Sequence, residues 1–313
     1  MPGAAERLVA AGYIAGWKVV GALPARLTRR AADIGADLVS DDGAGMDMLR
    51  RNLARVVGQE NVTRQLVRDS MRSYARYWLE AFQLPRMVGR ADLDEKLTAG
   101  LKGREHLEAS VDSGRGVVLT LPHSGNWDMA GMWLVNHYGG FTTVAERLKP
   151  EALYNAFVGY RESLGFEVLA LTGERTAPYQ RVKTVLEAGG IVCLMGERDL
   201  GRRGVPVQFF GEDTTFPAGP AKLALETGAQ LHTVHTWFTG TRSNPGWGMS
   251  VSPAVEVTTL EATVQRIADG FADAIQAHPA DWHMLQPLWP ADVPARGRRW
   301  ALDNRKRGAM GER

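Results

Sequence analysis

Cysteine is almost absent from the chain, since Cys193 is the only one among 313 residues. No disulfide can therefore form within the chain, and a reducing compartment is compatible with this composition. Long apolar runs are missing too, because no stretch approaches the length of about 20 residues that spans a bilayer. Low-complexity tracts and fixed repeats are also absent. With 44% hydrophobic residues, the chain has ample material for a globular core.

The most apolar stretch, residues 8–27, is interrupted by Lys18 and Pro24. As an interfacial helix it would hold Trp17 and Lys18 near lipid headgroups. As an amphipathic core helix it would pack against the rest of the protein, and the sequence leaves both interpretations open. A signal peptide is less favoured, because a charged residue interrupts the run and the small residues expected at a cleavage site are poorly matched.

Basic charge is concentrated at the two ends of the chain. Residues 1–30 and residues 291–313 each carry a net charge of +4, so the residues between them carry −6 within a total of +2. Basic ends around a mildly acidic body predict contact with an anionic membrane surface, with a solubilising fringe as the alternative. Nucleic-acid binding is disfavoured, since no platform of aromatic and basic residues accompanies the charge.

Helix and strand patterns divide one predicted domain, residues 1–313, into three parts. Residues 1–99 are expected to be helical, and a helix over 61–84 is expected to end at Pro85. Residues 100–290 form the α/β core, in which helices continue to residue 114 and strands then alternate with helices. This rhythm predicts a largely parallel central sheet flanked by helices on both faces. Residues 291–313 form a basic tail. The expected strands are 115–122, 141–146, 166–171, 191–196, 229–238 and 246–255.

A short polar motif, HSGNWD at residues 123–128, follows the first buried strand. On a continuous helix, side chains five residues apart differ by about 500° in direction, so His123 and Asp128 can cooperate only if the segment begins as a turn. Gly125 permits the backbone angles of such a turn, and Asn126 is a suitable N-cap for the helix that follows. We therefore expect a catalytic turn at the carboxyl end of the strand, where sites in parallel sheets lie.

The motif supplies a base and a carboxylate but no protein nucleophile. Ser124 lies beside the histidine, but no Gly-x-Ser-x-Gly elbow surrounds it. This combination predicts direct attack by a substrate hydroxyl, with His123 as the general base and Asp128 as the group that orients it. The alternative to this catalytic interpretation is that Asp128 caps the helix and His123 has only a structural role. No metal site is predicted, because His232 and His235, three residues apart on a strand, point to opposite faces.

Four sequence blocks share the order and spacing of a known family: HSGNWD at 123–128, YNAFVGYRESLG at 154–165, the segment from GERDLG to ETGA at 196–229, and HPADWHMLQPLW at 278–289. They resemble the lipid A biosynthesis branch of the His-x4-Asp glycerolipid acyltransferase superfamily. Asn155, Arg161 and Gly165 match its Asn-x5-Arg-x3-Gly block, and the resemblance covers roughly residues 100–290.

This resemblance implies the acyltransferase fold, an acyl transfer reaction and a set of site residues. It implies that Glu197 has a catalytic role near the acceptor or the catalytic pair, and that Arg161 orients the Glu197 carboxylate. A structural salt bridge between the two is the alternative. Arg198 and Asp199 either bind substrate or pair with each other, and His283 either serves the site or is structural. The candidates for substrate binding are Arg161, Asn126, Arg198, Asp199 and His283.

Within the superfamily, the chain is most similar to the mycobacterial phosphatidylinositol mannoside acyltransferases. That resemblance implies transfer of palmitoyl from acyl-CoA to a mannose 6-hydroxyl of a phosphatidylinositol mannoside, by a peripheral protein at the cytoplasmic face of the plasma membrane. Palmitoyl-CoA is then a donor substrate, and no cofactor, metal or nucleic acid is implied. The alternatives are another acceptor, an acyl carrier protein donor, a thioesterase, or a lipid-binding protein without turnover. Two features depart from the lipid A branch: Asp128 where Glu is usual, and no clear N-terminal membrane anchor.

Overall fold

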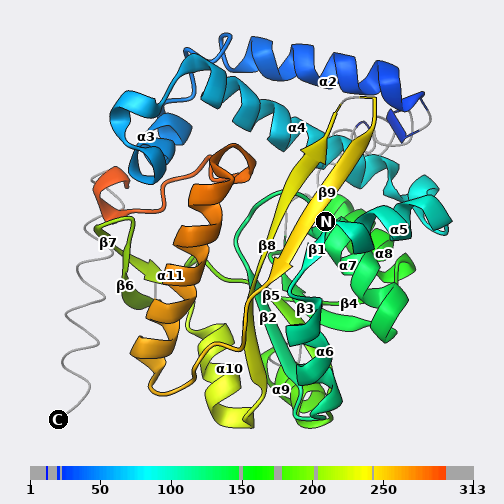
Figure 1. Cartoon of the computed structure of the whole chain (residues 1–313), viewed down its shortest axis with the longest axis vertical. Helices are drawn as coiled ribbons and strands as arrows, with labels where there is room; N and C mark the ends of the chain where they lie inside the picture. The colour runs from blue at the N-terminus through cyan, green and yellow to red at the C-terminus, as the bar shows by residue number, and fades with distance from the viewer. Residues whose placement is uncertain are drawn as a thin grey trace.

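The computed structural model describes residues 12, 20–21, 23–147, 151–172, 178–200, 204–241 and 243–293. Trp17, Lys18 and the basic tail beyond residue 293 lie outside these residues, so the expectations that rest on them remain predictions. Within them the fold is α/β, with a helical N-terminal region and a mostly parallel central sheet, which confirms the predicted fold class (Figure 1).

Most elements follow one another in the order that the sequence pattern predicts, and one short strand and a two-stranded hairpin are additions to it. The N-terminal helices are α2 (Ala25–Val39), α3 (Asp47–Val57), α4 (Arg64–Met87) and α5 (Ala91–Ala99). The sheet strands are β1 (Leu101–Lys102), β2 (Val117–Leu121), β3 (Phe141–Ala145), β4 (Phe166–Ala170), β5 (Ile191–Met195), β8 (Gln230–Gly240) and β9 (Pro245–Val251). The helices around them are α6 (Arg104–Asp112), α7 (Trp127–Tyr138), α8 (Glu151–Ser163), α9 (Pro178–Glu187), α10 (Gly219–Thr227) and α11 (Leu260–Ala277).

The seven strands are arranged in the order β1-β9-β8-β2-β5-β3-β4, and each neighbouring pair is parallel except β8 and β9. Strand β2 lies at the centre and is buried on both faces, which explains its continuous apolar sequence. Its partner β5 runs in register with Leu121 opposite Met195. Residues two positions beyond each strand, His123 and Glu197, therefore come side by side at the same edge of the sheet.

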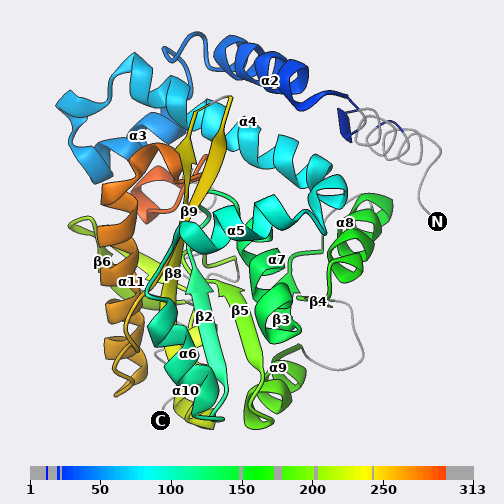
Figure 2. The ribbon, with the colours of Figure 1, turned by 45° about the vertical axis from the view of Figure 1, so that its right-hand side comes forward.

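Two apolar clusters cover the two faces of the sheet. Val118 of β2 packs with α9, α10 and α11, whereas Leu119 packs with α5, α6 and α7. A third cluster joins α2, α3 and α4, where Leu53 and Val67 are fully buried. Figure 2 shows α4, with α2 above it, lying across the end of the sheet at which β2 and β5 terminate. The N-terminal helices thus cover the edge where the site is expected.

Two local expectations are wrong, and one pair of strands was not expected. Helix α4 continues through Pro85 to Met87, because proline removes one hydrogen bond but the turn remains helical. Strand β1, which pairs with β9, interrupts the stretch expected to be helical up to residue 114. An antiparallel hairpin of β6 (Val205–Phe209) and β7 (Glu212–Phe216) was not expected, since these strands pair only with each other and lie outside the main sheet.

Candidate active site

The HSGNWD motif forms the turn that joins β2 to α7, as predicted. Gly125 has φ of +49°, and a Cβ there would lie 2.5 Å from the Thr236 carbonyl group on β8. Both the left-handed backbone and this close approach require glycine. The Thr236 hydroxyl donates to the carbonyl oxygen of Ser124 at 2.5 Å. Strand β8 therefore supports the turn from one side.

A short segment before the C-terminal tail supports the turn from another side. Gly125 N–H donates to the carbonyl oxygen of Asp281 at 2.9 Å, and His283 N–H donates to the carbonyl oxygen of His123 at 2.7 Å. These two bonds form an isolated antiparallel bridge between Ser124 and Trp282. The fourth sequence block thus lies against the first, although about 160 residues separate them. The Gly125 N–H is used in this bridge, so it does not provide the oxyanion contact that a turn of this kind often supplies.

Asn126 is the N-cap of α7, as predicted. Its side-chain oxygen accepts from Met129 N–H at 3.1 Å, and its amide nitrogen donates to Glu80 Oε2 at 2.9 Å. The side chain is 2% exposed and is not among the residues that line the cavity described below. The structure therefore gives Asn126 a role in capping α7, and its contact with substrate stays a prediction.

The carboxylate partner of His123 is Glu197. Nδ1 of His123 lies 2.7 Å from Glu197 Oε1, and the His123 backbone N–H donates to the same oxygen at 2.5 Å. Glu197 is completely buried, and Gly196 before it leaves no room for a Cβ beside Thr120. Because a carboxylate only accepts hydrogen bonds, Nδ1 carries the proton and Nε2 is left as a proton acceptor.

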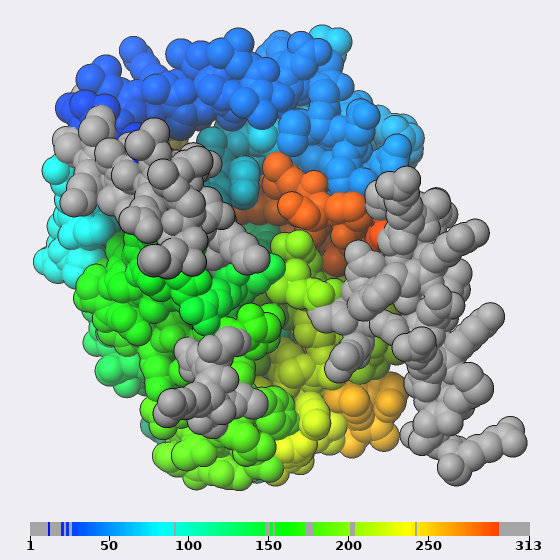
Figure 3. All heavy atoms as spheres, turned by 180° about the vertical axis from the view of Figure 1, so that it is seen from behind, coloured from blue at the N-terminus to red at the C-terminus, as the bar shows by residue number. Residues whose placement is uncertain are grey.

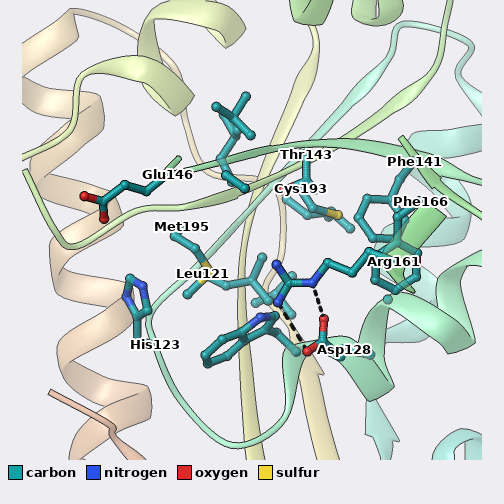
Figure 4. A pocket seen from close by; sticks show the side chains of 18 of the residues that line it. Leu121, His123, Asp128, Phe141, Thr143, Glu146, Arg161, Phe166, Cys193 and Met195 are labelled. Carbon is teal, nitrogen blue, oxygen red and sulfur yellow. Dashed lines mark hydrogen bonds and ion pairs between the residues drawn. The ribbon is translucent and has the colours of Figure 1, made fainter. Parts of the chain in front are cut away.

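Asp128 does not contact His123, and the predicted pairing between them is wrong. Its carboxylate binds Arg161, with Nε to Oδ1 at 2.8 Å and Nη2 to Oδ2 at 3.3 Å, and lies 3.4 Å from the Tyr77 hydroxyl. The physical reason is that Asp128 lies in the first turn of α7, which directs its side chain away from the strand end (Figure 4). The predicted pairing of Arg161 with Glu197 is also wrong, because the Arg161 guanidinium binds Asp128 and the Glu197 carboxylate binds His123.

The buried Asp128–Arg161 pair is electrostatically strong. Burial alone would lower the pKa of Arg161, but the neighbouring carboxylate outweighs it and raises that pKa. Burial, followed by the charge of Asp128, raises the pKa of Tyr77 well above its ordinary value. The raised pKa values keep Arg161 charged and Tyr77 neutral at neutral pH. The ion pair between Arg161 and Asp128 holds α7 against α8.

The remaining predicted residues lie at the cavity wall. Asp199 accepts from Gly204 N–H at 2.7 Å and from Thr215 at 3.1 Å, so it also holds the β6–β7 hairpin. His283 Nε2 lies 2.9 Å from the Ser73 hydroxyl. Burial lowers the pKa of His283 to about 3, so its imidazole is neutral at neutral pH. Arg198 is half-buried and lines the cavity.

These residues line one cavity of about 730 Å³. Its apolar wall comes from both the sheet and the surrounding helices and includes Leu119, Leu121, Phe141, Phe166, Cys193 and Met195. Its polar wall is formed by His123, Asp128, Arg161, Arg198, Asp199 and His283. Figure 4 shows His123 on one side of the cavity and the Asp128–Arg161 pair on another. A volume in this range and a mostly apolar lining with a few polar groups are typical of a site for an organic ligand.

Sequence reasoning missed three buried polar side chains on α4. Ser73 contacts His283, Tyr77 contacts Asp128, and Glu80 contacts Asn126. Their spacing of four and three residues places them on one face of the helix. A polar group at Glu80, on a face where apolar residues were expected, was the available signal.

The described residues offer neither a metal site nor a membrane-spanning helix. No three His, Cys, Asp or Glu side chains come together there in a group that could hold a metal ion. Among the helices that the structure describes, none combines the length and the apolar sequence needed to cross a membrane.

Comparison with known proteins identifies the family of the chain. The family model for bacterial lipid A biosynthesis acyltransferases matches residues 6–291. A phosphatidylinositol mannoside acyltransferase from Mycolicibacterium smegmatis is 54% identical over 286 residues, covering 90% of this chain and 91% of the relative. The protein of the same name from Mycobacterium tuberculosis is 53% identical over 285 residues, covering 90% of this chain and 88% of the relative. The chain therefore belongs to the bacterial lipid A biosynthesis acyltransferase family and is an acyltransferase.

Proposed function

We propose that the chain transfers a palmitoyl group from acyl-CoA to the 6-hydroxyl of a mannose in a phosphatidylinositol mannoside. The observation that carries this proposal is a proton acceptor, His123 held by buried Glu197, at the wall of a largely apolar cavity of about 730 Å³. The acceptor is taken from the names of the mycobacterial relatives. The proposal needs no metal or cofactor, and palmitoyl-CoA serves as the donor.

The apolar wall suits a long acyl chain. About fourteen methylenes, at ~0.8 kcal/mol each, would contribute on the order of 11 kcal/mol on burial. A single hydrogen bond contributes only about 1 kcal/mol. The fit of the acyl chain against residues such as Phe166 and Cys193 should therefore dominate the binding free energy of the donor.

The proposed reaction is a direct transfer. Nε2 of His123 accepts the proton of the mannose hydroxyl as its oxygen attacks the thioester carbonyl carbon. Glu197 keeps the proton on Nδ1 and stabilises the imidazolium that forms. When the tetrahedral intermediate collapses, the carbon–sulfur bond breaks, and the CoA thiolate takes the proton back from His123. The products are the acylated lipid and free CoA.

The polar wall of the cavity suits a sugar ring. Arg161, Arg198, Asp199 and His283 all line it, and together they offer donors and acceptors for hydroxyl groups. Nδ1 of His283 is buried and has no hydrogen-bond partner in the described part of the chain. We assign it to a hydroxyl of the acceptor, while Arg161 retains its ion pair with Asp128.

Helix α2 suits contact with a membrane surface. Leu27, Ile34 and Leu38 lie on one face of the helix and are 60% or more exposed, whereas Thr28 and Ala36 on the other side are buried. This helix (blue) runs along one edge of the molecule in Figure 3. We propose that this apolar face rests on the cytoplasmic side of the plasma membrane, as a peripheral attachment. Co-sedimentation with anionic vesicles should fall when Leu38 is changed to Glu, and unchanged binding would contradict this attachment.

The function is tested with the purified chain, palmitoyl-CoA, and phosphatidylinositol mannoside in mixed micelles. Free CoA and acylated lipid are measured together, for the wild type and for His123→Ala. The proposal expects acylated lipid from the wild type and a loss of at least about 10²-fold in the variant. CoA release that does not depend on the acceptor would indicate a thioesterase, and activity in His123→Ala would refute the assigned base.

A further inference from the structure

Glu80 is a buried carboxylate that no part of the proposed reaction uses. It lies on α4 and is completely inaccessible to solvent. It accepts three hydrogen bonds: from Arg76 Nε at 2.6 Å, from Asn126 Nδ2 at 2.9 Å and from Trp247 Nε1 at 2.7 Å. These donors come from α4 itself, from the start of α7 and from β9. Burial of a charged group is costly, so such complete pairing calls for an explanation.

The contact with Asn126 links Glu80 to the catalytic turn. Asn126 uses its amide nitrogen for Glu80 and its oxygen to cap α7 through Met129 N–H. Glu80 therefore fixes which way the amide faces, and with it the N-terminus of α7. His123 lies three residues before Asn126 in the same turn. Only Ser124 and Gly125 separate the cap from the proposed base.

The other two donors anchor Glu80 itself. Arg76 also donates to the carbonyl oxygen of Gly246 at 2.9 Å, and its guanidinium lies 4.0 Å from the centre of the Phe238 ring. Arg76 and Trp247 therefore hold the carboxylate against the β8–β9 hairpin. Because β8 also supports Gly125 and Ser124, the hairpin and α4 form one frame around the turn.

We propose that Glu80 is a positioning residue for acyl transfer, which acts through Asn126 to hold the His123 turn in its reactive geometry. This inference rests on the proposed function. Glu80 touches neither His123 nor the cavity wall, so its effect should be on the rate of the chemical step rather than on substrate binding.

Glutamine cannot replace the carboxylate at this site. A carboxylate accepts from three donors, whereas the amide of glutamine has one oxygen and one NH₂ group. In Glu80→Gln, the charged Arg76 should attract the amide oxygen, which leaves the NH₂ group facing the donors of Asn126 and Trp247. The Asn126 amide must then turn or move, and the cap of α7 is lost while the volume of the side chain is conserved.

The matched control is Trp247→Phe. It removes one donor to Glu80 but leaves the contact between Glu80 and Asn126 in place. We expect Glu80→Gln to lower kcat about 10- to 100-fold with little change in KM, because small misplacement of a catalytic group has effects of this size. Trp247→Phe should keep kcat within about threefold of the wild type. In a double-mutant cycle, Glu80→Gln combined with Asn126→Ala should lose no more activity than the more damaged single variant.

Hydrogen exchange of the Met129 amide provides a readout that does not depend on turnover. Glu80→Gln should speed this exchange at least about tenfold, since it removes the support of the cap, whereas Trp247→Phe should not. Equal kcat losses in both variants, additive losses in the double variant, or unchanged exchange in Glu80→Gln would overturn the proposal. Absence of acylated lipid from the wild type would instead contradict the proposed function, and the exchange comparison would still decide the role of Glu80 in holding the turn.

Discussion

Replacement of Glu197 by glutamine separates the two carboxylates that the sequence offers to His123. In the structure, Glu197 Oε1 contacts both Nδ1 and the backbone N–H of His123, whereas Asp128 binds Arg161. Glu197→Gln keeps the size of the side chain and removes its charge. The imidazolium that forms during proton transfer then has no neighbouring anion, and a glutamine NH₂ group facing Nδ1 would favour the wrong tautomer.

The size of the effect follows from the distance. With Nδ1 and Oε1 2.7 Å apart, the centres of the two charges are about 4 Å apart, and at an effective dielectric constant near 20 their attraction is about 4 kcal/mol. Losing it in the transition state alone should lower kcat by about 10³-fold. KM should change little, because Glu197 is buried and is not among the residues that line the cavity.

The assay is acylated-lipid formation at saturating palmitoyl-CoA, with Asp128→Asn as the comparison. That variant leaves buried Arg161 without its partner and should lose about 3–5 kcal/mol of unfolding free energy. Measured at low temperature, where it remains folded, it should retain a higher kcat than Glu197→Gln. The reverse order, with Glu197→Gln near wild-type activity and Asp128→Asn about 10³-fold lower, would refute the assignment of Glu197 as the partner of His123.

Three further predictions concern the turn, a buried histidine and the cavity. Gly125→Ala should cost about 1–3 kcal/mol of stability, measured by urea unfolding, because its Cβ meets the Thr236 carbonyl and the backbone is left-handed. Burial lowers the pKa of His283 from 6.5 to about 3, so in the folded state its imidazole takes up no proton between these two pH values. In the unfolded chain, His283 takes up a proton below its ordinary pKa of about 6.5. This residue should therefore make stability fall as the pH decreases below 6.5, by up to about 1.4 kcal/mol per pH unit. His283→Gln should reduce that slope by the same amount. Cys193→Trp should lower kcat/KM for palmitoyl-CoA more than tenfold but spare a short-chain acyl-CoA, because it fills the apolar wall.

Each of these predictions has an outcome that contradicts it. Wild-type stability in Gly125→Ala would show that the turn has more room than its contacts imply. An unchanged slope between pH 6 and pH 5 in His283→Gln would mean that this imidazole is charged or accessible in the folded state. Equal losses with long and short donors in Cys193→Trp would place the acyl chain elsewhere.

The sequence predicts where the site lies better than it predicts which side chains pair within it. His123 was expected at the end of a buried strand, because the apolar run before it and the turn residues after it are both local signals. Its partner Glu197 depends on β5 lying next to β2, and strand order is not encoded in either segment alone. The resemblance to a family drew attention to Glu197, placed it near the acceptor or the catalytic pair, and paired it with Arg161, whereas in the structure it binds His123.

The misplaced partner of Asp128 has a similar origin. Spacing along the chain predicted a turn, but it could not give the direction of the side chain once α7 begins at Trp127. The first turn of α7 directs the carboxylate away from the strand end, and Arg161 of α8 binds it there. The roles of Ser73 and Glu80 were missed because their partners lie far along the chain, and such contacts have no local pattern.

The connection between α4 and the segment around residue 283 has a consequence for synthesis of the protein. Ser73 and His283 are 210 residues apart, and Asn52 donates to the carbonyl oxygens of Met284 and Gln286. At about 5–20 residues per second, a ribosome needs roughly 10–40 s to synthesise the residues between α4 and the segment around residue 283. During that interval the emerging N-terminal helices lack their permanent neighbours, and their apolar surfaces are open to chaperones or to the lipid surface. The turn that carries His123 therefore gains this support only after the segment around residue 283 has been synthesised and has reached it.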